Sequence, residues 1–209
     1  MQTYFSRNNT GKRLYILFLG WGMDEKPLLP FIKDENVLLL YDAKDLKIDF
    51  DFSEYAEFYI MAFSYGVMQY ALVKDKLPHP TRLVALNGTL DMPHDLPQSV
   101  RQAMRGLTME NYLKFRRQYL VSTDEEYEKF NKIAPWRTIE DCMAELDKLE
   151  DMEKQPLPSV EFDLVYIAQS DNIIPTLNQQ RFWHGKNIKL ISGNHFALFN
   201  FKNISDIFA

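Results

Sequence analysis

The stretch that decides the fold is Glu57-Phe58-Tyr59-Ile60-Met61-Ala62-Phe63-Ser64-Tyr65-Gly66. Aromatic and branched apolar residues end abruptly at a serine, which is typical of a buried strand that turns sharply into a helix. Small residues stand two positions before and two positions after the serine, where such a turn leaves little room for a side chain. Ser64 is therefore a candidate nucleophile. A serine close to a glycine also occurs by chance, so the motif needs support from the rest of the chain.

Five further apolar runs have the character of the run at residues 58–62. They are continuous rather than alternating, as in strands that are buried on both faces of a parallel sheet. They cover residues 14–19, 37–41, 83–86, 164–168 and 188–191. Six short strands interleaved with longer segments indicate an α/β fold with a mostly parallel central sheet flanked by helices. Polar or glycine-bearing loops follow the strands, and in a parallel sheet these loops meet at the carboxyl edge, where ligands bind.

A long segment of different character, residues 97–156, separates the fourth strand from the fifth. Thr108 opens one helical pattern, in which Tyr112, Phe115 and Tyr119 share a face. Capping patterns at residues 123–126 and 138–141 predict a second and a third helix. The third carries an apolar stripe that we expect to pack against the body of the protein: Ile139, Cys142, Met143, Leu146 and Leu149. We therefore expect a single domain over residues 1–209, with a helical lid over the carboxyl edge of the sheet.

Composition restricts the class of protein. The chain has 209 residues, 46% of them hydrophobic, so it can bury a substantial core. A net charge of -5 argues against a dedicated nucleic-acid binder. The single cysteine, Cys142, excludes an intrachain disulfide and a thiolate metal cluster. No apolar run approaches the roughly 20 residues that span a bilayer, and the N-terminus lacks the apolar core of a signal peptide. We expect a cytoplasmic monomer that binds neither nucleic acid nor membrane.

A serine nucleophile needs a base, and the base needs an acid that orients it. His195 is the best base, because it directly follows the last predicted strand, whereas the other three histidines lie in surface or loop contexts. Asp171 follows the strand at 164–168 and is the best acid; a turn or helix N-cap is the alternative role. Asp163 precedes that strand and would lie at the opposite edge. The chain order Ser64, Asp171, His195 is that of α/β-hydrolases.

The oxyanion of an acyl-transfer intermediate also needs hydrogen-bond donors. One is expected from the backbone N–H of Tyr65, directly after the nucleophile. The other is expected from the loop after the first predicted strand, Gly20-Trp21-Gly22, whose glycines permit a close backbone approach. Trp21 would supply the N–H while its indole lines the pocket. Simple core packing is the alternative role for this indole.

Five motifs together carry a resemblance to a known family: Gly20-Trp21-Gly22, Phe63-Ser64-Tyr65-Gly66, Asn87-Gly88-Thr89, Ser170-Asp171 and Asn194-His195-Phe196. The chain resembles the BioG family of small α/β-hydrolases over about residues 14–201. The resemblance implies hydrolysis of the methyl ester of pimeloyl-acyl-carrier protein, which releases methanol in biotin synthesis. It also implies a Ser64, Asp171 and His195 triad with Trp21 and Tyr65 at the oxyanion hole. Many hydrolases carry Gly at the position of Ala62 and His at that of Leu19, and neither departure touches the triad.

The chemistry so inferred is two-step acyl transfer, which requires no metal or organic cofactor. The lid aromatics Tyr112, Phe115 and Tyr119 are candidates to line an acyl channel. A cluster of basic residues is a candidate to bind an acidic acyl-carrier protein: Arg101, Arg105, Lys114, Arg116 and Arg117. The alternative role of equal weight is to balance the charge of the acidic helices beside it. A general carboxylesterase or acyl thioesterase is one alternative function, and a non-catalytic binding protein with this fold is another.

Overall fold

Seven strands form one sheet in the computed structural model, which describes residues 1–209. Their spatial order is β1-β3-β2-β4-β5-β6-β7. Only β1 runs antiparallel to its neighbour, and all other pairs are parallel. The strands are β1 (Gln2–Ser6), β2 (Arg13–Phe18), β3 (Val37–Tyr41), β4 (Glu57–Phe63), β5 (Arg82–Leu86), β6 (Leu164–Ala168) and β7 (Ile188–Ile191). The predicted mostly parallel α/β sheet is confirmed.

The continuous apolar runs are continuous because both faces of the central strands are buried. In β2, Tyr15 and Leu17 point into one core cluster, while Leu14, Ile16 and Phe18 point into the cluster on the other face. Successive side chains of a strand alternate between faces, so a strand covered on both sides shows no polar positions. Burial on both faces fixes the register of the strands and hence the position of the loops that follow them.

The first strand of the structure is absent from the sequence prediction. β1 lies at the edge of the sheet, and its residues are exposed or half-buried, with no fully buried position. An edge strand covered on one side carries polar residues and therefore lacks the continuous apolar signature that revealed the other six. The strand at the opposite edge, β7, is also largely exposed. Its Ile188 and Ile191 are half-buried, and these two apolar residues made the strand detectable in the sequence.

Helices and short helical turns cover the two faces of the sheet. On one face lies α1 (Gly66–Val73), whose Val67, Tyr70 and Val73 join the core. On the other face lies the C-terminal 3-10 helix η5 (Ile204–Phe208), where Phe208 contacts Tyr15 and Tyr59 with ring centroids 5.4 and 5.5 Å apart. Shorter or peripheral elements complete the cover: η1 (Lys26–Phe31), η2 (Lys74–Lys76), α7 (Thr176–Phe182) and η4 (Ala197–Asn200).

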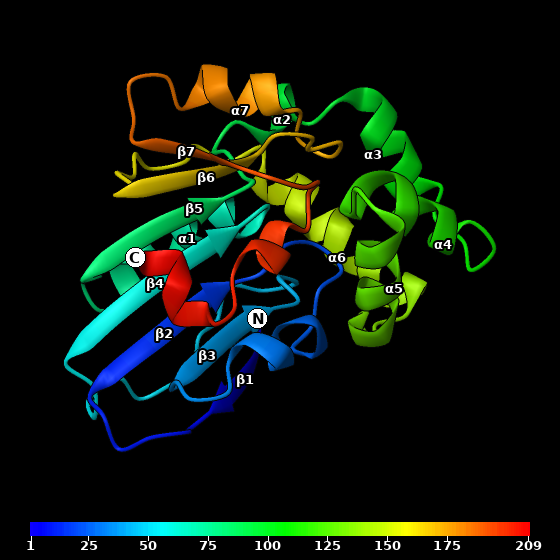
Figure 1. The fold of residues 1–209 in the computed structure, drawn as a ribbon. Coiled ribbons are helices and arrows are strands. Elements are labelled where there is room, and N and C mark those ends of the chain that lie inside the picture. Colours follow the sequence, from blue (N-terminus) through cyan, green and yellow to red (C-terminus); the bar gives the residue numbers. More distant parts are fainter.

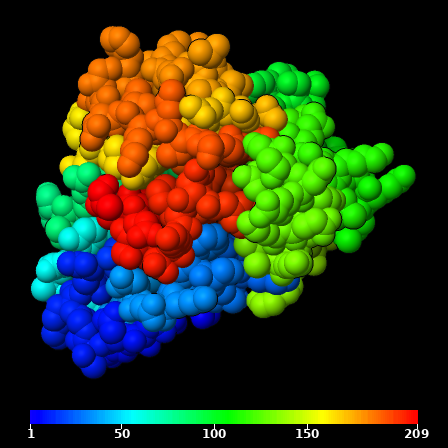
Figure 2. Space-filling model, in the orientation of Figure 1, coloured from blue at the N-terminus to red at the C-terminus, as the bar shows by residue number.

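The segment between β5 and β6 carries five helices, and residues 92–152 are called the insertion from here on. They are α2 (Met92–Asp95), α3 (Gln98–Arg105), α4 (Tyr112–Phe115) with a π-helical turn η3 (Arg116–Leu120), α5 (Asp124–Ile133) and α6 (Ile139–Met152). Figure 1 shows the strand arrows of β2 and β4 pointing toward these helices, so the insertion lies at the carboxyl edge. In Figure 2 its green side chains form a protrusion beside the C-terminal segment.

The three predicted helices of the insertion are present. Thr123 caps α5 through a capping box with Glu126, and the Thr138 hydroxyl caps α6 by accepting from the Asp141 amide. The α2 and α3 helices were not predicted, because their short sequences carry no capping pattern. None of the helices is both long and apolar enough to cross a membrane.

Candidate active site

The turn from β4 into α1 places Ser64 in a strained backbone conformation. Its φ is +56°, in the left-handed region that non-glycine residues rarely occupy, and such strain is characteristic of functional turns. The turn fits against β2 only because residue 66 has no side chain: a Cβ added at Gly66 would lie 2.3 Å from the carbonyl oxygen of Phe18. The sequence prediction of a tight strand-to-helix turn thus has a steric cause, and the turn holds the serine side chain at the carboxyl edge of the sheet.

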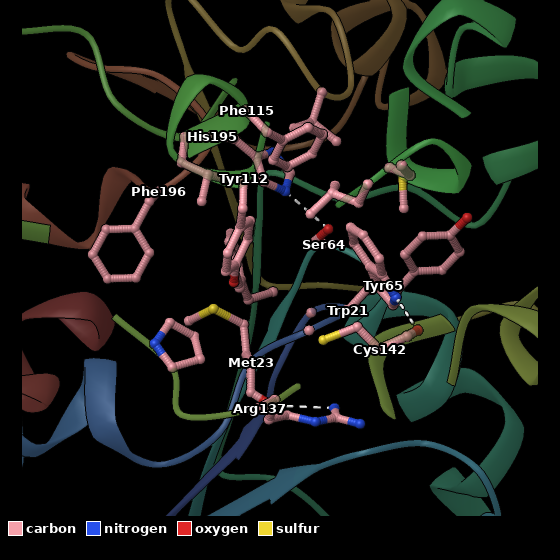
Figure 3. A pocket seen from close by; sticks show the side chains of 18 of the residues that line it. Trp21, Met23, Ser64, Tyr65, Tyr112, Phe115, Arg137, Cys142, His195 and Phe196 are labelled. Carbon is pink, nitrogen blue, oxygen red and sulfur yellow. Dashed lines mark hydrogen bonds between the residues drawn. The ribbon is translucent and has the colours of Figure 1, made fainter. Parts of the chain in front are cut away.

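The structure brings together the three residues that the sequence singled out. The Ser64 Oγ lies 2.9 Å from Nε2 of His195 (Figure 3). On the other side of the ring, Nδ1 of His195 lies 2.9 and 3.0 Å from the two carboxylate oxygens of Asp171. An ionised carboxylate only accepts hydrogen bonds, so Nδ1 carries the proton and Nε2 accepts from the serine hydroxyl. All three side chains are buried. Asp163, in contrast, accepts from the Leu83 amide at the start of β5, away from this edge.

Asp171 is fixed by more partners than the sequence indicated. Its Oδ1 accepts from the amides of Ile173 and Ile174 at 2.9 and 3.0 Å, and its Oδ2 accepts from the side chain of Gln179 at 2.8 Å. The turn role considered as an alternative is therefore real, and it coexists with the contact to His195. Gln179 is fully buried on α7 and had no sequence signal that distinguishes it from a surface glutamine.

Two asparagines hold the backbone of the histidine loop. The Asn87 side chain donates to the His195 carbonyl at 2.8 Å and accepts from the Ala168 amide at 2.7 Å. The Asn194 side chain accepts from the His195 amide at 2.8 Å and from the Asn172 amide at 2.9 Å. Both asparagines belong to the motifs that carried the family resemblance. Their structural role is to connect the loops after β5, β6 and β7.

The loop after β2 runs directly against the serine. A Cβ added at Gly20 would lie 2.9 Å from the Ser64 Cβ and 3.3 Å from its Oγ. The backbone amides of Trp21 and Tyr65 have no acceptor within the protein. Both residues line the same cavity as Ser64. The structure therefore places the two predicted oxyanion donors beside the serine, with their N–H groups unengaged.

An apolar cavity opens above Ser64. Its volume is about 60 Å³, below the roughly 300–1,000 Å³ of a typical ligand pocket. Trp21, Tyr112 and Phe115 line it, as the sequence predicted, whereas Tyr119 lies behind Phe115 with ring centroids 4.8 Å apart. Half of the residues that line the cavity come from the insertion, including Met104, Leu107, Leu120, Phe130, Ile139 and Cys142. The insertion thus covers the serine and leaves little free space.

The five basic residues of the predicted carrier site do not form one free patch. Arg101 is mostly buried and donates to Glu153 and to the Met92 carbonyl, and Arg105 pairs with Asp147 and Glu150 on α6. For these two, the alternative of balancing acidic helices describes what the structure shows.

The other three basic residues lie on α4 and the π-helical turn. Arg116 is buried, with its guanidinium 4.0 Å from the ring centroid of Tyr112. Lys114 is exposed, and Arg117 forms an exposed ion pair with Asp124. Among the five, Lys114 is the exposed residue without an ion pair, whereas Arg105 and Arg117 reach the surface as members of ion pairs.

A buried ionic network beneath the cavity escaped the sequence analysis. Glu145 of α6 is fully buried in the apolar stripe and accepts from the amides of Gly22 and Ala43 at 3.0 and 2.9 Å. Arg137 donates to Glu145 at 2.5 Å and to Asp42 at 2.9 Å. Burial raises the pKa of the Glu145 carboxyl, while Arg137 and the two amides oppose that rise. The only available signal was a carboxylate within an otherwise apolar helical stripe.

The rest of the apolar stripe packs as predicted. Leu146 and Leu149 are buried in the core cluster beneath α6. Cys142 is buried as well, and burial raises the pKa of its thiol to about 12. No group of three or more His, Cys, Asp or Glu side chains is arranged to hold a metal ion.

The sheet order and the placement of the serine turn define an α/β-hydrolase fold. The same fold occurs in the enol-lactonase of Burkholderia xenovorans, with a TM-score of 0.66 at 12% sequence identity over 95% of this chain and 90% of that one. The chain belongs to the BioG family: the model of that family, described as pimeloyl-ACP methyl esterase BioG, matches residues 1–207. It is an α/β-hydrolase of the esterase type, as the sequence resemblance indicated.

Two relatives are similar along most of this chain. The crystal structure of BioG from Haemophilus influenzae superposes with a TM-score of 0.89 at 25% identity, covering 100% of both chains. A malonyl-[acyl-carrier protein] O-methyltransferase of Bacteroides fragilis is 28% identical over 197 residues, which are 88% of this chain. The match spans 40% of the length of that longer protein.

Proposed function

We propose that this protein hydrolyses the methyl ester of pimeloyl-acyl-carrier protein to free pimeloyl-acyl-carrier protein and methanol. The observation that carries the proposal is the continuous hydrogen-bonded chain from Ser64 through His195 to Asp171, in a chain of the BioG family. A methyl ester is cleaved by such a chain through ordinary acyl transfer, and every step uses groups of the protein and water.

In the first step the Ser64 hydroxyl attacks the ester carbonyl while Nε2 of His195 takes its proton. The negative charge of the tetrahedral intermediate develops on the former carbonyl oxygen, close to the free amides of Trp21 and Tyr65. Asp171 holds Nδ1 of the ring and stabilises the imidazolium that forms. His195 then returns the proton to the methoxide oxygen, and methanol leaves.

In the second step water attacks the acyl-enzyme. His195 accepts a proton from the water, a second tetrahedral intermediate forms at the same two amides, and Ser64 leaves with that proton. The product is a carboxylate, which the apolar cavity binds poorly because its walls offer little to replace hydration. The apolar walls thus favour the neutral ester over the charged product.

The apolar cavity and the family together support an acyl chain as the substrate portion that enters. Methyl esters on acyl-carrier proteins are also the chemical product suggested by the name of the Bacteroides relative, an O-methyltransferase acting on malonyl-acyl-carrier protein. Acyl-carrier proteins are acidic, and the exposed charges of Lys114 and Arg117 lie on the part of the insertion next to Tyr112 and Phe115. These two residues are the carrier-binding candidates that we retain, because Arg105, although exposed, is engaged by two carboxylates of α6.

The decisive experiment compares wild type with Ser64→Ala on pimeloyl-acyl-carrier protein methyl ester, with released methanol as the readout. We expect turnover by the wild type and loss of turnover in the variant. Retained activity in Ser64→Ala would contradict the assigned nucleophile. Faster cleavage of an acyl-carrier thioester than of the methyl ester would favour a thioesterase. Activity on free short esters equal to that on the carrier-bound methyl ester would favour a general carboxylesterase. A fluorophosphonate that fails to label Ser64 would indicate a non-catalytic binding protein.

The carrier site is tested separately by charge reversal. Lys114→Glu with Arg117→Glu should raise the KM for carrier-bound ester and leave turnover of p-nitrophenyl acetate unchanged, because only the former substrate carries an acidic protein. Lys33→Glu with Lys202→Glu is the matched control, since it makes the same charge change at exposed residues outside the insertion. An equal rise in KM in both double variants would remove the specific role of Lys114 and Arg117.

A further inference from the structure

Helix α6 contacts both loops that carry the oxyanion donors. The Trp21 indole donates to the carbonyl of Cys142 at 2.6 Å, a contact visible in Figure 3, and the Gly22 amide donates to Glu145 at 3.0 Å. Farther along the helix axis, the Tyr65 hydroxyl donates to Glu153 at 2.8 Å. A helix that only covered a cavity would need apolar contacts alone. Three polar contacts to the two donor residues and their immediate neighbour indicate a more specific role.

Of these three contacts, the one made by Glu145 gives the strongest indication of a functional role, because burying its carboxylate costs free energy. Its side chain is fully removed from solvent, and a buried carboxylate is tolerated only where partners satisfy it. The Gly22 and Ala43 amides and the Arg137 guanidinium provide those partners. Replacing such an ionic cluster with apolar residues is often neutral for stability, so stability alone gives little reason for a carboxylate here.

The geometry of the loop links Glu145 to the Trp21 amide. The Gly20 carbonyl accepts from the Met23 amide at 3.3 Å, and the peptide bond between Gly20 and Trp21 is planar. The Trp21 N–H therefore points to the opposite side from this turn contact and has no acceptor in the protein. Glu145 holds the next amide, that of Gly22, whose φ of +71° allows the loop to reverse. The Gly22 and Trp21 amides lie in successive peptide planes, so anchoring the first restrains the Trp21 φ and ψ that orient the second.

We propose that Glu145 is a positioning residue that sets the oxyanion-binding amide of Trp21, with Glu153 as a weaker second arm at Tyr65. The inference rests on the proposed function. Glu153 is the weaker arm because the serine turn itself already fixes Tyr65: the Ser64 carbonyl accepts from Val67, and the Ser64 amide donates to Leu86. Helix α6 is accordingly part of the catalytic apparatus as well as a wall of the cavity.

The test compares Glu145→Gln with the control Arg105→Gln. Glutamine keeps the shape of the side chain but retains one acceptor oxygen, so it cannot serve Gly22, Ala43 and Arg137 together. The control breaks the ion pairs of α3 with Asp147 and Glu150 on the solvent side of α6. The measurements are kcat and KM on p-nitrophenyl acetate, the inhibition constant of a trifluoromethyl ketone that mimics the tetrahedral intermediate, and the final extent of Ser64 labelling by a fluorophosphonate.

We expect kcat of Glu145→Gln to fall by about tenfold to hundredfold, less than the roughly 10²–10³ caused by removing a donor outright. KM should change by less than about threefold, the ketone should bind more weakly in proportion to kcat, and labelling should still reach completion. Glu153→Gln should show the same pattern with a smaller loss. If Glu145→Gln does not accumulate as folded protein, Trp21→Phe removes the hydrogen bond to the Cys142 carbonyl, keeps an aromatic ring in the cavity wall and should lower kcat about fivefold.

The results separate this inference from the proposed function. An active wild type whose Glu145→Gln form keeps kcat within twofold overturns the positioning role and leaves the esterase assignment intact. An equal loss in Arg105→Gln also overturns it, because general docking of the insertion then explains the effect. A loss confined to KM assigns Glu145 to substrate binding instead. A wild type that neither hydrolyses the ester nor is labelled at Ser64 overturns both proposals.

Discussion

Gly20→Ala tests how closely the loop after β2 must approach the nucleophile. The added methyl would lie 2.9 Å from the Ser64 Cβ, about 0.5 Å short of the 3.4 Å at which ordinary contact begins, and 3.3 Å from Oγ. Since Ser64 is held by the strained turn, the loop must move. A shift of this size should lower kcat/KM for p-nitrophenyl acetate by about tenfold to hundredfold. The free energy of unfolding should fall by about 1–3 kcal/mol, as for other overpacked sites.

Gly11→Ala is the matched control, because an added methyl at Gly11 is as close to its nearest atom as one at Gly20, but lies outside the candidate active site. Its added methyl would also lie 2.9 Å from the nearest atom, Oδ1 of Asn9, in an exposed loop that contributes no residue to the cavity. Displacing Asn9 weakens its hydrogen bonds with the Gly11 amide and the Asn36 side chain, so we expect Gly11→Ala to lower stability and to keep activity close to wild type. Full esterase activity in Gly20→Ala, or an equal loss in both variants, would refute the argument that Gly20 is needed for close approach.

Three further outcomes follow from the structure. Asp171→Asn should lower kcat by about 10⁴-fold, because its amide would face donors from His195 and Gln179; a loss below tenfold would mean another group orients the histidine. Burial raises the pKa of the Cys142 thiol from 9.0 to about 12, so between pH 8 and pH 10 this group alone should cost about 1.4 kcal/mol of stability, in addition to the loss from the buried tyrosines. Urea unfolding of Cys142→Ala should show a loss smaller by this amount. Thr123→Ala should destabilise by about 1 kcal/mol through its lost helix cap, with esterase kinetics unchanged.

The placement of Ser64, Asp171 and His195 at one edge of the sheet could be predicted from the sequence, because the signals for it are local. A continuous apolar run marks each central strand, and the polar residue that follows it is placed by the sheet at the carboxyl edge. Ser64, Asp171 and His195 each follow such a run, so parallel pairing alone brings them close. The distances between these three side chains also depend on Asn87 and Gln179. Asn87 contacts His195, 108 positions away, and Gln179 contacts Asp171, 8 positions away; neither contact leaves a local pattern in the sequence.

The polar contacts of the insertion could not be predicted in the same way. Arg101 and Arg105 formed a basic cluster in sequence, but the acids that pair with them lie 42 to 52 positions away on α6. Charge read along the chain gives no information on which face of a helix meets which neighbour. The same reason hid Glu145, which looked like one acid among many in an acidic segment and is the one that the fold buries.

The two parts of the site have different consequences for function. Loops after strands of the sheet hold Ser64, His195 and Asp171, and an α/β-hydrolase fold by itself does not define a substrate. Half of the residues that line the cavity above Ser64 come from the insertion, so under the proposed function these residues contribute to selectivity for the acyl group. If α6 also orients the Trp21 amide, changes in the insertion affect kcat as well as KM. Substrate choice and rate are then coupled through one helix, and an insertion exchanged between relatives would have to preserve Glu145 and its partners to remain active.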